Sequence, residues 1–427
     1  MTYEEALEYI HGVNWTFCKP GLERIKELCK ALGNPQSTLK FIHVAGTNGK
    51  GSFCSMAESV LRSAGYKTGL FTSPYIVEFN ERMRVDGENI SNSELAEITE
   101  YVRPIADKMS DKPTEFELIT AIAFEYFKRH KCDFVVLEAG MGGRLDSTNV
   151  IDTSILSVIT GISLDHTAYL GNTVSEIAGE KAGIIKTGTP VLFGGENGEA
   201  MAVIHSAAVE KNAPFHTPDY SDLKIKEATL EKTVFNYKRR ENLEIRLLGT
   251  YQPKNASLVI TAMDILNARG FKITEENIRR GIKSAVWHSR FEVISKTPTV
   301  IFDGAHNPEG ISAACDSIRR YFGNERVIVL SGVLADKDYN FIANKIARVA
   351  SCVYTLTPDN PRALTADAYA EVFSSLGVAA TSSDTLALAT ERAYRAALEE
   401  GSALVVLGSL YTYREVRDKI NELKGVN

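Results

Sequence analysis

The chain has 427 residues, of which 44% are hydrophobic and 24% charged, and its formal net charge is −6. That length exceeds what one hydrophobic core normally supports, so we expect a globular protein of at least two domains. The acidic balance argues against a nucleic-acid partner, and no apolar run approaches the roughly 20 residues that span a bilayer, so neither nucleic acid nor a membrane is an expected partner.

The N-terminal sequence MTYEEALEYI is acidic and amphipathic, unlike the basic and apolar segments of a secretion signal. The six cysteines are scattered and show no spacing typical of a zinc or redox site. We therefore expect reduced cysteines and a cytoplasmic protein.

Short apolar runs alternate with amphipathic helical stretches in the first half of the chain. The expected buried strands are residues 41–46, 68–73, 133–140, 154–162 and 190–195. This alternation is typical of a parallel sheet covered by helices. The sequence therefore predicts an α/β domain at the start of the chain.

The pattern changes between residues 215 and 250, where short polar alternating stretches indicate a small antiparallel sheet. Two helices are expected next, at 255–270 and 274–285. Four further apolar strands are then expected at 299–304, 326–333, 352–358 and 402–409.

We place the domain junction near residues 292–298, where a proline and small polar residues interrupt the pattern. The predicted domains are 1–294, an α/β domain that includes the antiparallel patch, and 295–427, a smaller Rossmann-like α/β domain.

The segment HVAGTNGKGSFC, residues 43–54, lies between the first expected strand and an apolar-periodic helix. Backbone N–H groups of Gly49, Lys50 and Gly51 could bind phosphate oxygens at the positive end of that helix. Lys50 could neutralise phosphate charge, and the Ser52 hydroxyl could ligate Mg²⁺. The spacing departs from the common phosphate loop because Gly51 separates the lysine from the hydroxyl. The alternative is an ordinary glycine-rich turn, but strand, lysine, hydroxyl and helix together predict a nucleotide site.

Polar residues follow the ends of later strands. Glu138 ends one apolar strand, and Asp165 and His166 follow the next. Ligands of open α/β sheets bind at such strand ends, where Mg²⁺ needs oxygen ligands. A solvated glutamate and a structural histidine are the alternatives. Asp146, further along the glycine-rich loop, is a weaker candidate because it could simply cap a turn.

The next helix carries a lysine on its apolar side. Thr173 and Glu176 form a capping box at its start, and Lys181 lies four residues after Ile177. A lysine there loses part of its preference for the charged form. The alternative is a lysine whose amine reaches past the apolar surface into water.

The second expected domain has its own polar strand end. Asp303 ends a strand, His306 follows, and Asn307 and Pro308 open a helix. These side chains could reach a nucleotide held by the first domain, or they could serve only the strand-to-helix turn.

Together these segments resemble the folylpolyglutamate synthases, which are often also dihydrofolate synthases, within the Mur ligase superfamily of ATP-dependent amide ligases. The similarity runs from about Gly21 to Arg417. The stretches that carry it include HVAGTNGKGS, NERMRVDGENIS, LEAGMGGRLDSTNV, LLGTYQPKNA and DGAHNPEG. The resemblance implies a P-loop-containing parallel-sheet ATPase domain, the Mur ligase central domain, followed by a smaller Rossmann-like domain.

The resemblance also implies the site residues. The implied ATP-binding residues are Gly46, Thr47, Asn48, Gly49, Lys50, Gly51, Ser52, Asn255, Arg290, Asp303 and His306. The implied ligands of two Mg²⁺ sites are Ser52, Ser73, Glu138, His166 and a carbamylated Lys181. The expected catalytic residues are Lys50, Glu138, His166, Lys181, Asp303 and His306. The candidate substrate-lining residues are Phe116, Glu117 and Asp146.

Several positions depart from the commoner family pattern. Tyr75 and Tyr251 stand where the family frequently has histidine, and Gly161 replaces a frequent asparagine. The usual WPGR motif reads WHSR at 287–290, but Arg290 is kept. These departures bear on the choice of carboxylate substrate more than on the reaction.

The implied reaction transfers the γ-phosphoryl group of ATP to a substrate carboxylate, and L-glutamate then attacks the acyl phosphate. The carboxylate would belong to a folate or to dihydropteroate, and we expect a monomer. The alternatives are a Mur-type peptide ligase acting on a nucleotide-sugar precursor and a P-loop ATPase that is not a ligase.

Overall fold

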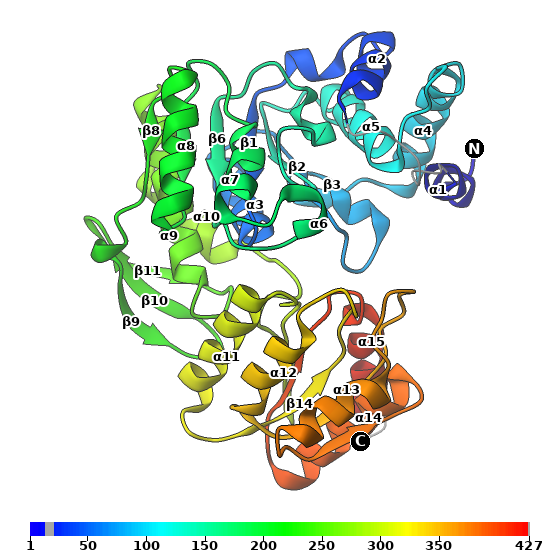
Figure 1. The fold of residues 1–427 in the computed structure, drawn as a ribbon. Helices are drawn as coiled ribbons and strands as arrows, with labels where there is room; N and C mark the ends of the chain where they lie inside the picture. Colours follow the sequence, from blue (N-terminus) through cyan, green and yellow to red (C-terminus); the bar gives the residue numbers. More distant parts are fainter. Residues whose placement is uncertain (13–20, 426–427) are drawn as a thin grey trace. The chain divides into compact units, whose positions relative to one another are not determined.

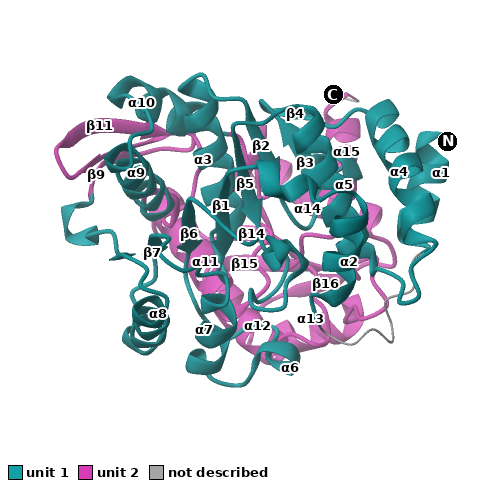
Figure 2. Cartoon of the chain, turned by 90° about the horizontal axis from the view of Figure 1, so that it is seen from above, with its two compact units in different colours: residues 1–223, 254–285 teal, residues 224–253, 286–427 magenta. Residues whose placement is uncertain are grey.

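The computed structural model describes residues 1–12 and 21–425. Contacts divide the chain into two compact units, which Figure 2 distinguishes by colour. Unit 1 comprises residues 1–223 and 254–285, and unit 2 comprises residues 224–253 and 286–427.

Unit 1 is built on an eight-stranded sheet with the order β4-β3-β2-β5-β1-β6-β7-β8. Its strands are β1 (Phe41–Ala45), β2 (Thr68–Phe71), β3 (Met83–Val85), β4 (Glu88–Asn89), β5 (Phe134–Glu138), β6 (Leu156–Ile159), β7 (Val191–Phe193) and β8 (Phe215–His216). All neighbours pair in parallel except the β2–β3 and β3–β4 pairs. Strands β1 and β5 are buried along their whole length, which explains their continuous apolar sequence.

Helices cover this sheet, as Figure 1 shows. They are α1 (Tyr3–His11), α2 (Glu23–Ala31), α3 (Lys50–Ser63), α4 (Asn92–Ala106), α5 (Glu115–Arg129), α6 (Thr167–Leu170), α7 (Val174–Ala182), α8 (Gly198–Glu210), α9 (Gln252–Ala268) and α10 (Glu275–Ser284). One apolar cluster joins α2, α4 and α5 to β1 and β5, and a second joins α7 and α8 to β6 and β7. The expected α/β fold of the first part is confirmed, while β3, β4 and β8 were not expected because they are too short to show a pattern.

Unit 2 contains a six-stranded sheet with the order β12-β13-β17-β14-β15-β16. Its strands are β12 (Glu292–Lys296), β13 (Thr299–Phe302), β14 (Val327–Ser331), β15 (Ala350–Thr355), β16 (Ala380–Ser382) and β17 (Leu404–Leu407). Its helices are α11 (Pro308–Phe322), α12 (Tyr339–Ala347), α13 (Ala366–Ser375), α14 (Leu386–Glu400) and α15 (Tyr413–Gly425). The sheet is parallel except for β12, which pairs antiparallel with β13. The expected smaller α/β domain is therefore confirmed as a fold.

Two expectations about the division differ from the structure. The boundary at 294/295 falls inside β12, whose pairing with β13 makes it part of the unit 2 sheet. The antiparallel sheet of β9 (Lys224–Ala228), β10 (Thr233–Tyr237) and β11 (Arg240–Ile245) forms as expected, but its contacts group it with unit 2. Leu248, just after β11, packs into the core of unit 2, which explains this grouping.

No helix in the described ranges is long and apolar enough to cross a membrane.

Candidate active site

The predicted phosphate loop leaves the end of β1 and enters α3. Gly46 has φ +152° and Gly49 has φ +86°. An added Cβ at Gly46 would lie 1.9 Å from Thr160 Oγ1, and one at Gly49 would lie 2.9 Å from Asn255 Oδ1. Both positions therefore need glycine for space as well as for backbone conformation. Asn255, predicted from the resemblance to bind ATP, lies against the loop.

The loop is fastened to the strand beside it. Thr47 N donates to Gly161 O at 2.7 Å, and Thr160 Oγ1 donates to Asn48 O at 2.7 Å. These bonds fix the loop that precedes α3, and the first N–H groups of a helix have no partner within the helix itself. A helix N-terminus of this kind can bind an anion, and the phosphate contacts of this loop stay predictions.

Two lysines point at the same loop carbonyl. Lys50 Nζ donates to Gly46 O at 3.1 Å and to Thr47 O at 3.3 Å, and Lys181 Nζ donates to Gly46 O at 2.9 Å. Lys181 is only 3% exposed, so the alternative of an amine reaching out into water is wrong. The tertiary fold thus brings together two lysines that the sequence separates by more than a hundred residues.

The Lys181 amine has an unusual protonation equilibrium. Burial, together with the nearby charge of Lys50, lowers the pKa of Lys181 to about 7. Near neutral pH a large fraction of this amine is therefore uncharged and nucleophilic.

Glu138 and Ser73 lie together at the carboxyl ends of β5 and β2. Ser73 N donates to Glu138 Oε2 at 3.4 Å, and Glu138 is only 4% exposed. Arg82 donates to Ser73 Oγ at 3.1 Å. The structure therefore brings together two of the predicted metal ligands, and the solvated-glutamate alternative is wrong. The contact of Arg82 was not expected from the sequence, where an arginine in a polar run gives no such signal.

His166 takes a different position. It is exposed, has φ +50°, and precedes the short helix α6. Its backbone N–H donates to Asp165 Oδ1 at 2.8 Å. Its predicted role as a metal ligand stays a prediction.

Asp146 serves the loop after Glu138. Its carboxylate accepts from Met141 N at 2.8 Å, Thr148 N at 3.0 Å and Thr148 Oγ1 at 2.5 Å. Burial raises the pKa of Asp146 even though these hydrogen bonds oppose the shift. Asp146 therefore caps a turn, and a substrate contact stays a prediction.

The two candidates on α5 differ from each other. Phe116 lies against Gly140, where an added Cβ would be 2.7 Å from the ring. Glu117 is 2% exposed, completes the capping box of Thr114 and accepts from Arg24 Nε at 2.9 Å. Glu117 thus has a structural role, while contact of either residue with substrate stays a prediction.

Unit 2 holds the remaining predicted residues. Asp303 is 2% exposed and accepts from Tyr251 Oη at 2.7 Å, from Phe291 N at 3.0 Å and from Ala305 N at 2.8 Å. His306 Nδ1 lies 2.8 Å from Gly304 O. Asn307 caps α11, and Pro308 is its first residue, as expected. These residues therefore form the strand-to-helix turn, and their nucleotide contacts stay predictions.

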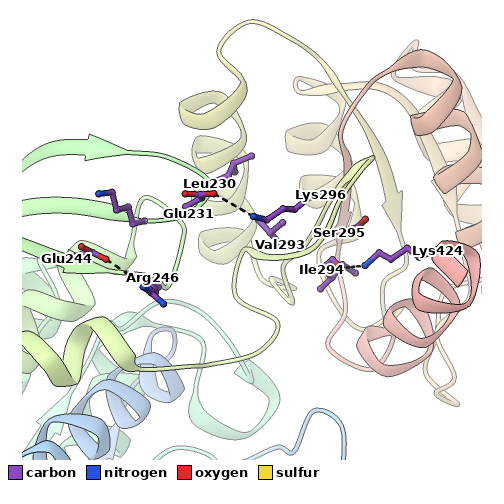
Figure 3. A pocket seen from close by; sticks show the side chains of 10 residues that line it. Leu230, Glu231, Glu244, Arg246, Val293, Ile294, Ser295, Lys296 and Lys424 are labelled. Atoms are coloured by element: carbon purple, nitrogen blue, oxygen red, sulfur yellow. Dashed lines mark hydrogen bonds and ion pairs between the residues drawn. The ribbon is translucent and has the colours of Figure 1, made fainter. Parts of the chain in front are cut away.

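A separate cavity of about 500 Å³ lies in unit 2 (Figure 3). Its lining includes Lys232, Arg246, Lys296 and Lys424 alongside Glu231 and Glu244. Three of the cations lie within 4 Å of carboxylates, and none of the predicted site residues lines this cavity. The charges that line this cavity are thus largely paired with one another at the surface. The cavity is therefore a weaker candidate for the active site than the loop between β1 and α3.

Comparison with known protein families places both halves of the chain in one class. Residues 44–263 match the Mur ligase middle domain, and residues 289–410 match the Mur ligase glutamate ligase domain.

Individual relatives narrow the class. The chain is 39% identical to the dihydrofolate synthase/folylpolyglutamate synthase of Bacillus subtilis, over 98% of this chain and 99% of that protein. It is 36% identical to the folylpolyglutamate synthase of Lacticaseibacillus casei over 98% and 99% of the two chains. A solved structure of E. coli FolC in complex with DHPP and ADP superimposes with a TM-score of 0.85 at 31% identity, covering 99% of each chain. The chain therefore belongs to the Mur ligase family and, within it, to the folylpolyglutamate and dihydrofolate synthases.

Proposed function

We propose that this chain, an ATP-dependent amide ligase by family, joins L-glutamate to the carboxylate of a folate or of dihydropteroate and forms ADP and phosphate. The observation that supports this best is the convergence at one edge of the unit 1 sheet. The glycine-bounded phosphate loop, Lys50 and Glu138 lie at the carboxyl ends of neighbouring strands, and the amine of Lys181 reaches the same loop from α7.

The chemistry needs charge neutralisation and positioning rather than a protein nucleophile. A carboxylate oxygen of the substrate attacks the γ-phosphorus, the bond to the β–γ bridging oxygen breaks, and ADP leaves with that oxygen. Lys50, whose Nζ donates to two loop carbonyls, could turn its ammonium group to the phosphates, where its positive charge would neutralise the negative charge that develops.

The second step forms the amide. The neutral amine of L-glutamate attacks the acyl carbon, and a tetrahedral intermediate collapses with release of phosphate and a proton. Rigid placement of the reactants supplies most of the rate enhancement in such a reaction.

Ser52, Glu138 and Ser73 fit Mg²⁺ bound together with phosphate oxygens. Within the described ranges no group of three or more His, Cys, Asp or Glu side chains could hold a metal ion without help. Mg²⁺ typically uses one or two carboxylates plus substrate phosphates, so the buried Glu138 beside Ser73 suits it. When bound, Mg²⁺ would neutralise phosphate charge. A second site that includes His166 is also proposed.

We also propose that Lys181 is carbamylated. Its low pKa supports reaction with CO₂, because only the neutral amine is a nucleophile. Carbamylation would convert a cation beside the loop into an oxygen ligand. Lys181→Ala should lose most ligase activity while still binding ATP, and a short carboxylic acid in solution should partly restore activity. Full activity in this variant would remove Lys181 from the mechanism.

From unit 2 we propose Arg290, Asp303 and His306 as nucleotide-contacting residues, on the strength of the family resemblance. Phe116, Glu117 and Asp146 are proposed near the carboxylate substrate. A cytoplasmic location and a monomeric state are also proposed; the free cysteines among the described residues fit a reducing compartment. Light scattering on the purified chain tests the monomer.

The test of the function is product analysis by mass spectrometry. The protein is incubated with MgATP and L-glutamate, and with dihydropteroate or tetrahydrofolate in separate reactions. A mass gain of one glutamyl unit with matching ADP is the expected result, and Lys50→Ala should abolish it. ADP without a glutamylated product would favour the peptide ligase or the ATPase instead.

A further inference from the structure

Arg290 lies between two residues with left-handed backbone. Ser289 has φ +60° and Phe291 has φ +46°, and neither is glycine. A positive φ is uncommon for residues other than glycine and is especially unfavourable for a bulky side chain such as that of Phe291. Such a pair persists only where the surrounding structure holds it, and strain of this kind concentrates at functional sites.

Two carboxylates hold the backbone on either side of the arginine. Glu292 Oε2 accepts from Ser289 N at 2.8 Å, and Asp303 Oδ2 accepts from Phe291 N at 3.0 Å. Charge-assisted hydrogen bonds of this kind are stronger than those between neutral groups. They explain how two unfavourable conformations are maintained within three residues.

Each carboxylate is held in turn by a tyrosine from elsewhere in unit 2. Tyr251 Oη donates to Asp303 Oδ2 at 2.7 Å, and Tyr413 Oη donates to Glu292 Oε2 at 2.9 Å. The paired residues are 52 and 121 positions apart in the sequence. Asp303 is 2% exposed and Tyr413 is fully buried, so little water can replace either hydroxyl group.

The guanidinium group itself is only partly engaged. Its Nη1 donates to Ser289 O at 3.0 Å and to Ser289 Oγ at 3.3 Å. Within the described residues of unit 2 it forms no ion pair with a carboxylate. A planar guanidinium with remaining donors is suited to phosphate oxygens.

We propose that Tyr251 and Tyr413 are positioning residues for the nucleotide. Acting through Asp303 and Glu292, they lock the backbone on both sides of Arg290 and present its guanidinium group to the polyphosphate in a single conformation. This inference rests on the proposed function, which includes Arg290 in the nucleotide site. It also assigns a role to Tyr251, a position where the family frequently has histidine.

A double-mutant cycle on the full chain tests the inference. The affinity for a non-hydrolysable ATP analogue with Mg²⁺ is measured by calorimetry for wild type, Tyr251→Phe, Arg290→Ala and the double variant. Loss of Tyr251 Oη should weaken affinity about tenfold, because a hydrogen bond to a charged group is lost. In the Arg290→Ala background the same change should have no further effect, because no guanidinium remains to be positioned.

Additive losses in the cycle, or wild-type affinity in Tyr251→Phe, would overturn the inference. Tyr394→Phe is the matched control, since Tyr394 is also buried in unit 2 but donates to Thr297 O at 3.3 Å. It should leave analogue affinity unchanged. If Tyr251→Phe does not fold, as judged by its Tm, the same cycle is carried out with Tyr413→Phe, which removes the hydrogen bond to Glu292 instead. Failure of the ligase function would instead appear as a missing glutamylated product in wild type.

Discussion

The phosphate loop of unit 1 and the Arg290 segment of unit 2 both hold a cation beside irregular backbone, but they do so by different means. The loop uses glycines, and Gly46 and Gly49 occupy conformations and spaces that exclude a Cβ. The Arg290 segment has non-glycine residues at positive φ, held by the carboxylates of Glu292 and Asp303.

This difference determines what can be read from the sequence. The glycines of the loop can be recognised in the sequence by their identity and their spacing. Support from Asp303, Tyr251 and Tyr413 leaves no local pattern, because these residues meet the Arg290 segment only after folding. Three substitutions, from the largest expected effect to the smallest, test whether the loop depends on its glycines and the Arg290 segment on its carboxylates.

The largest effect is expected at Gly46. In Gly46→Ala the new Cβ would lie 1.9 Å from Thr160 Oγ1, which is itself bound to Asn48 O and cannot move freely. We expect the affinity for a non-hydrolysable ATP analogue to fall by more than about 100-fold and the free energy of unfolding to fall by about 2–4 kcal/mol. Calorimetry and urea unfolding measure the two quantities.

Gly179→Ala is the control for that change. Gly179 lies within α7, has no positive φ, and an added Cβ meets nothing within 4 Å. The substitution should leave affinity unchanged and raise stability by up to about 1 kcal/mol, because alanine favours the helix. Wild-type affinity in Gly46→Ala would show that the loop does not depend on its glycine.

An intermediate effect is expected at Lys181, whose amine donates to the carbonyl of Gly46. Its pKa is about 7 in the folded chain against an ordinary value of 10.5. Between these values the unfolded chain binds a proton that the folded chain does not, so the free energy of unfolding should rise with pH. The slope should approach about 1.4 kcal/mol per pH unit above pH 7.

Lys181→Met should lack this contribution. Urea unfolding of both proteins between pH 7 and pH 9, in buffers free of CO₂, measures the difference between the two slopes. Equal slopes of unfolding free energy against pH in the two proteins would mean that Lys181 has an ordinary pKa in the folded chain and that its amine is not buried beside the loop.

The smallest effect is expected at Glu292. Burial acts to raise its pKa, but hydrogen bonds from His288, Ser289 N and Tyr413 outweigh it and hold the pKa below the usual range. Its stabilisation is therefore present above the unfolded-state pKa and is lost as pH falls through the folded value.

Glu292→Gln should cost about 1–2 kcal/mol at pH 7 and should flatten the loss of stability in acid. Unfolding measured from pH 3 to pH 7 checks both effects, with the exposed Glu371→Gln in α13 as control. An unchanged acid profile would mean that the Arg290 segment does not need the Glu292 charge.

Much of the fold was predictable because its causes are local. Continuous apolar runs predicted β1, β5 and β14, and the capping box of Thr173 predicted the start of α7. The strand β12 was not expected, and the domain junction was placed there instead, because half-exposed residues and a nearby proline are typical of a loop and the pairing with β13 is not visible in the sequence.

The sequence by itself determined the phosphate loop, the alternation of strands and helices, and the helix caps, because glycine conformation, hydrophobic periodicity and capping act within a few residues. Only the tertiary structure decided the strand order, the placement of β9–β11 with unit 2, the contact of Lys181 with Gly46, and the tyrosine–carboxylate pairs around Arg290. These features join residues far apart in the chain, and a buried polar group finds its partner only when packing excludes water from both.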